Sequence, residues 1–395
     1  MMSFLCGLRL YSAVGYQWFL LSFCSWGIAN LTFAQSSIPK TKVALLLSSQ
    51  GVEQTVSHEV KRGVEVFQVA HPELFQLIKL KMVDTRGSLE QASSLVTNLK
   101  EQDFSYVIGL RNGEEALWVA QFAEVNPMLF LSPLSTYSKV TLGKKNSFQI
   151  AANEVLQGAA LARFSEIDLE RKKILILVND RSVYSQAFAE SFIKAIQLKA
   201  QIHTEIHHSN GTELRIEELE SKLNKFKPDL IVICDELTRS SVLAKYIHKK
   251  DPSMPFLTGD IFGNEKAVKS LLKEVPNIRI FYSSLWSGRE KTEENRLFKK
   301  HYRELWKNDN PSQEAALTFD AFLILTRSLK LSGNSRDLDR VRYFLERTTF
   351  ETTQGKLDFM SSPTHSPIKN VHIKVTNAKI HKHVKTLRTQ WKEKR

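Results

Sequence analysis

The sequence predicts an α/β protein built from two similar, doubly wound lobes. With 395 residues, the chain is too long for one compact core and suits two lobes of roughly 150 residues each. Short apolar runs alternate with longer amphipathic segments, which is the pattern of a parallel sheet covered by helices on both faces. This alternation starts a second time in the middle of the chain, so we expect two copies of one arrangement.

A distinct leader precedes the first expected strand. Residues 1–34 contain no acidic side chain and one basic side chain, Arg9, and the second half of this segment is mostly apolar. It closes with Thr32-Phe33-Ala34, which places small residues where a signal peptidase requires them. We therefore expect a signal peptide over 1–34 and a periplasmic protein. The alternative is an uncleaved membrane anchor, but the apolar run is shorter than the about 20 residues that span a bilayer.

The first lobe is predicted from apolar runs and from helical periodicity. Unbroken apolar runs indicate strands that are buried on both faces, whereas Val56, Val60, Val64 and Phe67 recur three or four residues apart, as on one side of a helix. In chain order we expect strands at 43–47, 80–83, 106–109 and 128–131, and helices at 56–69, 89–99 and 114–123.

The second lobe repeats this pattern and is followed by a helical section. We expect helices at 157–164, 184–198, 214–226 and 240–247, and strands at 174–178, 202–206, 229–233, 256–257 and 278–282. A helix-rich section then covers 295–331, and a last helix covers 338–347. The alternation within 356–359 and 371–375 predicts a hairpin, and residues 379–395 are expected to form a solvated basic tail.

Composition and motifs exclude several classes of protein. The formal net charge of +13 favours acidic ligands or anionic lipid and peptidoglycan neighbours. Nucleic-acid binding is not expected, because the sequence has no Cys/His finger, basic zipper or aromatic RNA-binding motif. Cys234 is the single cysteine outside the leader and is expected in a buried strand, so no metal, redox centre or cofactor is predicted. Without a nucleophile elbow, phosphate-binding loop or zinc-protease helix, we do not expect an enzyme.

Several short motifs occur in the order found in one family of binding proteins. They are Val83-Asp84-Thr85, Val107-Ile108-Gly109, Leu131-Ser132-Pro133, the helix start Tyr184–Phe188, the turn with Gly259-Asp260, Phe319-Asp320-Ala321 and Thr353–Phe359. On these residues the chain resembles the leucine/isoleucine/valine-binding proteins of ABC transporters over residues 41–378. Each motif alone is common, and their order and spacing carry the resemblance.

The resemblance implies a periplasmic binding protein of type I, in which three crossovers join two lobes. Lobe 1 would comprise 41–153 and 284–345, and lobe 2 would comprise 154–283 and 346–378. Such a protein captures a small ligand between its lobes, here an amino acid or a related compound, and delivers it to an ABC permease in the inner membrane. Open parallel sheets also bind ligands at the carboxyl ends of their strands, independently of any family.

The first candidate ligand-binding residues follow the third and fourth strands of lobe 1. In the family, hydroxyl groups and backbone amides in these loops hold the carboxylate of an amino acid, and Ser135 and Thr136 are retained in the fourth-strand loop. The third-strand loop departs from the family, because Arg111-Asn112-Gly113 stands in place of the usual serine. Amides at a helix start bind anions, and Arg111 would add a charge-assisted bond. Glu114 and Glu115 would repel a carboxylate; the alternative for these acids is a favourable interaction with the helix N-terminus.

The second lobe contributes two candidates. Tyr184 can stack on a ligand or donate a hydrogen bond to it, and its alternative is packing at a helix start. Asp260 stands where the family often has an acid that pairs with the ligand's ammonium group, although an aspartate beside Gly259 is also an ordinary turn residue. Asp235, just after an apolar strand, is a weaker candidate.

A rival hypothesis keeps the fold and changes the role. Proteins of similar fold act as ligand sensors or as activators of other cell-envelope proteins, and the altered third-strand loop and the basic charge favour this rival. A receptor should have an open, polar cleft, whereas an interaction protein can fill its cleft with side chains.

Overall fold

The computed structural model describes residues 40–388 except 51–52, 197–202, 210–215, 264, 308, 335 and 377–380. The predicted signal peptide lies outside these described residues, as do residues 389–395 of the predicted tail. Within the described part of the chain, no helix is both long enough and apolar enough to cross a membrane.

The first sheet contains five parallel strands in the order β2-β1-β3-β4-β5. The strands are β1 (Thr41–Leu47), β2 (Ile78–Asp84), β3 (Tyr106–Ile108), β4 (Leu129–Ser132) and β5 (Ser147–Gln149). Alternate residues of β1 face opposite ways, so Val43 and Leu45 pack in one hydrophobic cluster and Ala44 and Leu46 in another. Both faces of the sheet are therefore covered, as the apolar runs predict.

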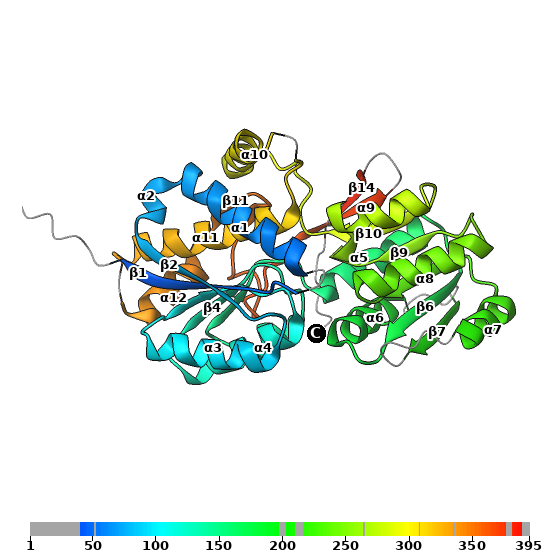
Figure 1. Cartoon of the computed structure of the whole chain (residues 1–395), viewed down its shortest axis with the longest axis horizontal. Coiled ribbons are helices and arrows are strands. Elements are labelled where there is room, and N and C mark those ends of the chain that lie inside the picture. The colour runs from blue at the N-terminus through cyan, green and yellow to red at the C-terminus, as the bar shows by residue number, and fades with distance from the viewer. Residues whose placement is uncertain are drawn as a thin grey trace, which may run out of the picture. The chain divides into compact units, whose positions relative to one another are not determined.

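The helices of lobe 1 lie on these two faces (Figure 1). The helices from the first part of the chain are α1 (Glu53–Ala70), α2 (Pro72–Phe75), α3 (Leu89–Glu101), α4 (Gly113–Val125) and the 3₁₀ turn η1 (Ser138–Val140). From the later part of the chain come α10 (Glu293–Leu305), α11 (Gln313–Leu331) and α12 (Leu338–Arg347). Helices α10 and α11 both contact α1. The later part of the chain therefore returns to lobe 1.

The second sheet repeats the strand order of the first. Its order is β14-β13-β10-β9-β8-β6-β7, and the five strands from β7 to β10 are parallel. They are β6 (Lys173–Asn179), β7 (His203–Ser209), β8 (Leu230–Cys234), β9 (Phe256–Thr258) and β10 (Ile280–Ser284). Their helices are α5 (Glu154–Ile167), α6 (Val183–Ile196), α7 (Ile216–Phe226), α8 (Leu237–Lys250), α9 (Glu265–Glu274) and the 3₁₀ turn η2 (Asp260–Gly263). The predicted fold class, two Rossmann-like lobes, is confirmed.

The end of the chain differs from the sequence-based prediction. Strands β11 (Phe350–Thr352) and β12 (Gly355–Leu357) pair with each other, and β11 contacts α10 and α11. This hairpin therefore packs on lobe 1 although 346–378 was assigned to lobe 2. Strand β13 (Asn370–Thr376) pairs with β10 instead of with β12, so the predicted hairpin of 356–359 with 371–375 is wrong.

The expected basic tail is also partly corrected. Residues His381–Arg388 form β14, which pairs antiparallel with β13 along its whole length. Leu387 of β14 is buried and belongs to the same hydrophobic cluster as Val371 of β13. An apolar side chain on the inner face explains why these residues join the sheet despite their lysines.

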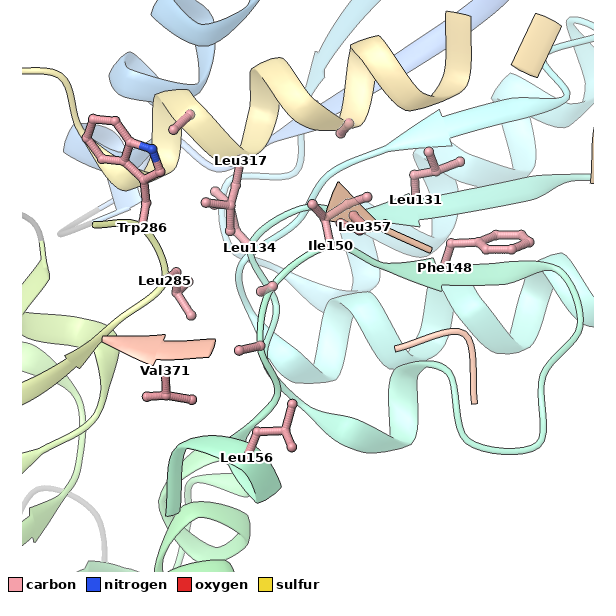
Figure 2. Packing of buried hydrophobic residues seen from close by; sticks show 14 of the residues in the cluster. Leu131, Leu134, Phe148, Ile150, Leu156, Leu285, Trp286, Leu317, Leu357 and Val371 are labelled. Atoms are coloured by element: carbon pink, nitrogen blue, oxygen red, sulfur yellow. The ribbon is translucent and has the colours of Figure 1, made fainter. Parts of the chain in front are cut away.

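Three segments join the two sheets, and one hydrophobic cluster runs through them. Ile150 lies between β5 and α5, Leu285 and Trp286 follow β10, and Val371 begins β13 after the connection from β12. Figure 2 shows these side chains together with Leu131 and Phe148 of the first sheet, Leu317 of α11 and Leu156 of α5. The crossovers are therefore packed in the core rather than exposed as free linkers.

Candidate functional site

All seven predicted ligand-binding residues line one cavity of about 470 Å³. Lobe 1 contributes Arg111, Asn112, Gly113, Ser135 and Thr136, and lobe 2 contributes Tyr184 and Asp260. Each follows the carboxyl end of a parallel strand, which is where open α/β sheets place their ligands. The topology thus brings these residues together, and ligand binding by them stays a prediction.

Further residues of the cavity were not predicted. They are Glu53, Glu114, Leu134, Tyr137, Asn179, Arg181, Ser182, Val183, Glu236 and Ile261. Glu53 and Glu114 lie in the first turns of α1 and α4, and Glu236 is the N-cap residue of α8. Each of these three helices follows a strand. An acid at that place is the only signal in the sequence that points to them.

The amino end of α4 is largely closed by its own cap. The side chain of Asn112 accepts hydrogen bonds from the backbone N–H groups of Glu114 (2.9 Å) and Glu115 (3.1 Å). Gly113 allows the ring of Tyr137 to lie against it, since a Cβ here would be 3.2 Å from Tyr137 Cβ. Two of the amides that could have bound a ligand's carboxylate are therefore already satisfied.

The two acids of this loop have different environments. Glu115 is buried away from the cavity and accepts a hydrogen bond of 2.6 Å from Thr85 Oγ1. Burial raises the pKa of Glu115, and the nearby acids Glu53 and Asp84 act in the same direction. Glu114 is exposed and lines the cavity. Glu115 therefore has the structural role that the sequence left open, and Glu114 contributes charge to the site.

Arg111 is committed to an ion pair on its own lobe. Its Nη1 donates to Glu53 Oε1 at 2.7 Å, and both side chains are partly buried. Burial opposes the charge of Arg111, but Glu53, Glu236 and Asp260 together hold its pKa above the usual value. The guanidinium thus stays ionised and is largely balanced before any solute arrives.

Asp260 is held in place by groups from both lobes. Gln157 of α5 hydrogen bonds to its carboxylate, and Ser283 Oγ in turn donates to Gln157 Oε1. Gln313 of α11 donates from Nε2 to the backbone oxygen of Asp260 at 3.1 Å. Burial raises the pKa of Asp260, whereas Arg111 and Gln157 oppose this shift. A carboxyl group that is fixed and desolvated in this way is suited to bind a hydrogen-bond donor or a cationic group of a ligand.

Three buried polar atoms of the cavity residues have no hydrogen-bond partner among the residues that the structure describes. They are Ser135 Oγ, Tyr184 Oη and Asp260 Oδ1. Leaving such atoms unpaired costs about 1–3 kcal/mol each. A ligand group that reached one of these buried atoms with a matching donor or acceptor would remove this cost.

The weaker candidate Asp235 does not line the cavity. Its carboxylate accepts from Asn179 Nδ2 at 3.0 Å and from Arg239 Nε at 2.7 Å. The following residue, Glu236, is exposed and reaches the cavity. Asp235 therefore orders the start of α8, and its neighbour faces the site.

Tyr184 depends on the absence of a side chain at Gly259. The ring of Tyr184 stacks on Phe188 with 6.0 Å between centroids and an interplanar angle of 17°. A Cβ on Gly259 would overlap Tyr184 Oη and would lie 3.2 Å from its Cζ. Glycine at this position therefore determines where the tyrosine hydroxyl stands.

We expect Gly259→Ala to lower the free energy of unfolding by about 1–3 kcal/mol, because the new methyl group displaces Tyr184. In a Tyr184→Phe background the hydroxyl is absent, and the same change should cost less than about 1 kcal/mol. Urea unfolding of the two single variants and the double variant measures this coupling. If Gly259→Ala lowers the free energy of unfolding equally in the parent protein and in the Tyr184→Phe variant, the tyrosine hydroxyl is not the reason that glycine is required.

A buried acid of the first crossover adjoins the site. Glu154, at the start of α5, accepts a hydrogen bond of 3.1 Å from the backbone N–H of Ser138. Burial raises the pKa of Glu154 to about 8. At neutral pH this carboxyl group is mostly protonated, so it adds little charge to the site. In the described residues, no group of three or more His, Cys, Asp or Glu side chains is arranged to hold a metal ion.

Comparison with known proteins places this geometry in context. No protein-family model matches the chain. Over 243 residues, or 60% of the chain, it is 22% identical to the Leu/Ile/Val-binding protein homolog 3 of Brucella melitensis, and the match spans 65% of that protein's length. A second relative, the Leu/Ile/Val-binding protein BraC3 of Rhizobium johnstonii, is also 22% identical over 60% of the chain, spanning 66% of the relative.

Solved structures agree with the fold over more of the chain. The leucine-binding protein LivK from Thermotoga maritima has a TM-score of 0.80 at 19% identity, covering 88% of this chain and 98% of that one. LivJ from Streptococcus pneumoniae, in complex with isoleucine, has a TM-score of 0.75 at 18% identity over 88% of this chain and 98% of its own. The resemblance drawn from the sequence motifs is confirmed: the chain has the fold of these solved structures and is similar in sequence to the leucine/isoleucine/valine-binding proteins.

Proposed function

We propose that this protein captures a small polar solute, such as an amino acid or a related compound, between its lobes and delivers it to an ABC permease. The cavity of about 470 Å³ is the observation that carries this proposal. Its volume falls in the range of about 300–1,000 Å³ that is usual for small-molecule sites. Its lining also matches such sites, because polar groups from both lobes converge on one space.

The open cavity favours the receptor over the rival interaction protein. An interaction protein of this fold can fill the space between its lobes, whereas here a cavity of about 470 Å³ is open among residues of both lobes. The relatives and solved structures named above are binding proteins for small solutes by name, which supports the same choice.

Binding is expected to act through closure of the lobes. Ser135 and Thr136 belong to lobe 1 and Tyr184 and Asp260 to lobe 2, so a solute that contacts all four residues bridges the lobes. Such a solute has more contacts in the closed state and shifts the population toward it. A permease can then distinguish loaded from empty protein by shape.

Export and transport are part of the same proposal. The expected signal peptide would place the protein in the periplasm, and LivJ is the substrate-binding protein of an amino-acid transporter, which supports a role beside an importer. The basic character of the chain, with a formal charge of +13, suits an envelope with anionic lipids and polymers.

Thermal unfolding against a solute library tests the receptor role. The library should contain neutral, acidic and basic amino acids, diamines and aromatic carboxylates. A solute that binds only folded protein stabilises it by about 2.7 kcal/mol at a hundredfold excess over Kd. We expect at least one class to raise the melting temperature, and small-angle scattering should show closure with the same solute. No shift with any class would contradict the proposal.

A paired set of variants separates the cavity from nonspecific effects. The double variant Ser135→Ala/Asp260→Asn should lose the stabilisation, because it removes a hydroxyl group and a negative charge from the cavity lining. Glu101→Gln changes an exposed side chain at the end of α3 and should keep it. Equal stabilisation of both variants would place the solute outside this cavity.

A further inference from the structure

The cavity has the opposite sign of charge to the chain as a whole. The chain has a formal charge of +13. Among the described residues, the charged groups of the cavity lining are the carboxylates of Glu53, Glu114, Glu236 and Asp260 and the guanidinium groups of Arg111 and Arg181. Acids thus outnumber bases in the lining by two. An excess of acid in a concave site attracts and retains solutes of the opposite charge.

The positive charge of Arg111 is not available to a ligand. Arg111 already donates to Glu53 at 2.7 Å, so that pair is neutral as a unit. The remaining base, Arg181, is an exposed side chain at the edge of the cavity, where solvent and salt screen its charge. Among the charged residues that line the cavity, Asp260, which is 5% exposed, is then the most buried one without an opposite charge bonded to it in the described part of the chain.

The backbone N–H groups at the start of α4, where the fold would place a ligand's carboxylate, are also poorly available. Asn112 Oδ1 occupies two backbone N–H groups at the start of α4. Glu114 adds a negative charge in the same turn. A neutral zwitterion would therefore find a site for its ammonium group and a poorer site for its carboxylate.

Two independent features of the lining suit a cation. The carboxyl group of Asp260 lines the cavity, and its buried Oδ1 accepts no hydrogen bond from the described residues, so an ammonium or guanidinium donor that reached Oδ1 would supply its missing partner. Tyr184 also lines the cavity and stacks on Phe188, whereas Tyr137, which lines it from the other lobe, has Lys139 Nζ 5.8 Å from its ring centre. Aromatic rings near carboxylates bind organic cations through their negative faces.

Building on the proposed function, we propose that the captured solute carries a net positive charge, as in a basic amino acid or a diamine. Its cationic group binds Asp260 beside Tyr184, and Glu236 contributes attraction from the edge of the cavity. The positive charge of the solute partly neutralises the lining, which has two more acidic than basic side chains. The same lining discriminates against neutral branched-chain amino acids and against aromatic carboxylates.

Calorimetric titration with matched pairs of solutes tests the charge preference. Lysine is compared with norleucine, arginine with citrulline, and putrescine is added as a diamine without a carboxylate. We expect the charged member of each pair to bind at least about tenfold more tightly than its neutral counterpart. Binding of putrescine as tight as that of lysine would assign the site to diamines, whereas its failure beside tight lysine binding would assign it to basic amino acids.

The outcomes separate this inference from the receptor role on which it rests. If leucine, norleucine, citrulline or benzoate binds as tightly as the cations or more tightly, the charge preference is overturned and the receptor role stands. If no solute in the library binds, both are overturned.

Two conservative variants test whether the acids of the lining cause the preference. Glu236→Gln should reduce the ratio of lysine to norleucine affinity by about tenfold, since it removes one charge and preserves shape. Glu101→Gln removes an equal charge at an exposed site on α3 and should leave the ratio within about twofold. Equal ratios for both variants and the parent protein would overturn the role assigned to Glu236.

Discussion

Replacing Asp320 with alanine is expected to lower the free energy of unfolding by about 3–5 kcal/mol. Asp320 lies on α11 and is fully buried. Its carboxylate accepts three hydrogen bonds of 2.8 Å, from the backbone N–H and Oγ1 of Thr353 and from Nε2 of Gln354. Without the carboxylate, these donors lose their acceptor inside the protein.

The loss extends to the crossovers between the lobes. Lys369, in the segment that leads to β13, donates from Nζ to Gln354 Oε1 at 2.9 Å and to the backbone oxygen of Ile150. Burial raises the pKa of Asp320, whereas the hydrogen bonds from Gln354 and Thr353 and the charge of Lys369 act in the opposite direction. Asp320 therefore anchors α11, the turn after β11 and two crossover segments through one carboxylate.

Urea unfolding at pH 7.5 measures the effect. Asp320→Asn keeps one acceptor oxygen and should cost less than Asp320→Ala. Asp339→Ala is the matched control, because its side chain is 78% exposed on α12, and it should change stability by less than about 0.5 kcal/mol. A similar loss for Asp339→Ala and Asp320→Ala would refute the importance of the buried network.

We expect Gly63→Ala to lower the free energy of unfolding by about 2–3 kcal/mol. Gly63 lies on the face of α1 that packs against α11. A Cβ at this position would overlap the backbone oxygen of Ala315 and lie 2.9 Å from Thr318 Cβ. Backbone atoms of a helix cannot move aside singly, so α1 and α11 would have to separate.

This expectation opposes the intrinsic preference of a helix. Alanine is favoured over glycine within a helix by about 1 kcal/mol, so propensity alone would make Gly63→Ala stabilising. The sign of the change in the urea midpoint therefore decides between propensity and close packing. Gln68→Ala, at an exposed position of the same helix, is the control and should have an effect below about 0.5 kcal/mol.

The fold was predictable where burial leaves its pattern in the sequence. Runs such as 174–178 are apolar throughout because both faces of the sheet are covered, and they coincide with strands in the structure. Strand β5 has only three residues, Ser147-Phe148-Gln149, and its polar ends are buried through tertiary contacts. Strand β14 alternates cations with other residues, so its sequence resembles a solvated segment.

The site was predictable in its location and less so in its electrostatics. Loops after parallel strands converge in any open α/β sheet, and the family resemblance singled out Ser135, Tyr184 and Asp260 within these loops. The pairing of Arg111 with Glu53 depends on β1 and β3 being neighbours, which the order of strands along the chain does not reveal. Similarly, the sequence does not show that Glu236 and not Asp235 faces the cavity.

Strand β14 also has a consequence for how the chain tolerates truncation. It lies at the edge of the second sheet and shields β13, whose Val371 and Ile373 are buried. Exposed Lys382 on β14 discourages another strand from adding to this edge. A chain shortened after residue 376 would present β13 as a bare, apolar edge, which is the kind of strand that recruits copies of itself. The lysines of β14 thus disfavour aggregation through this edge of the sheet, and they also add to the positive charge of the chain.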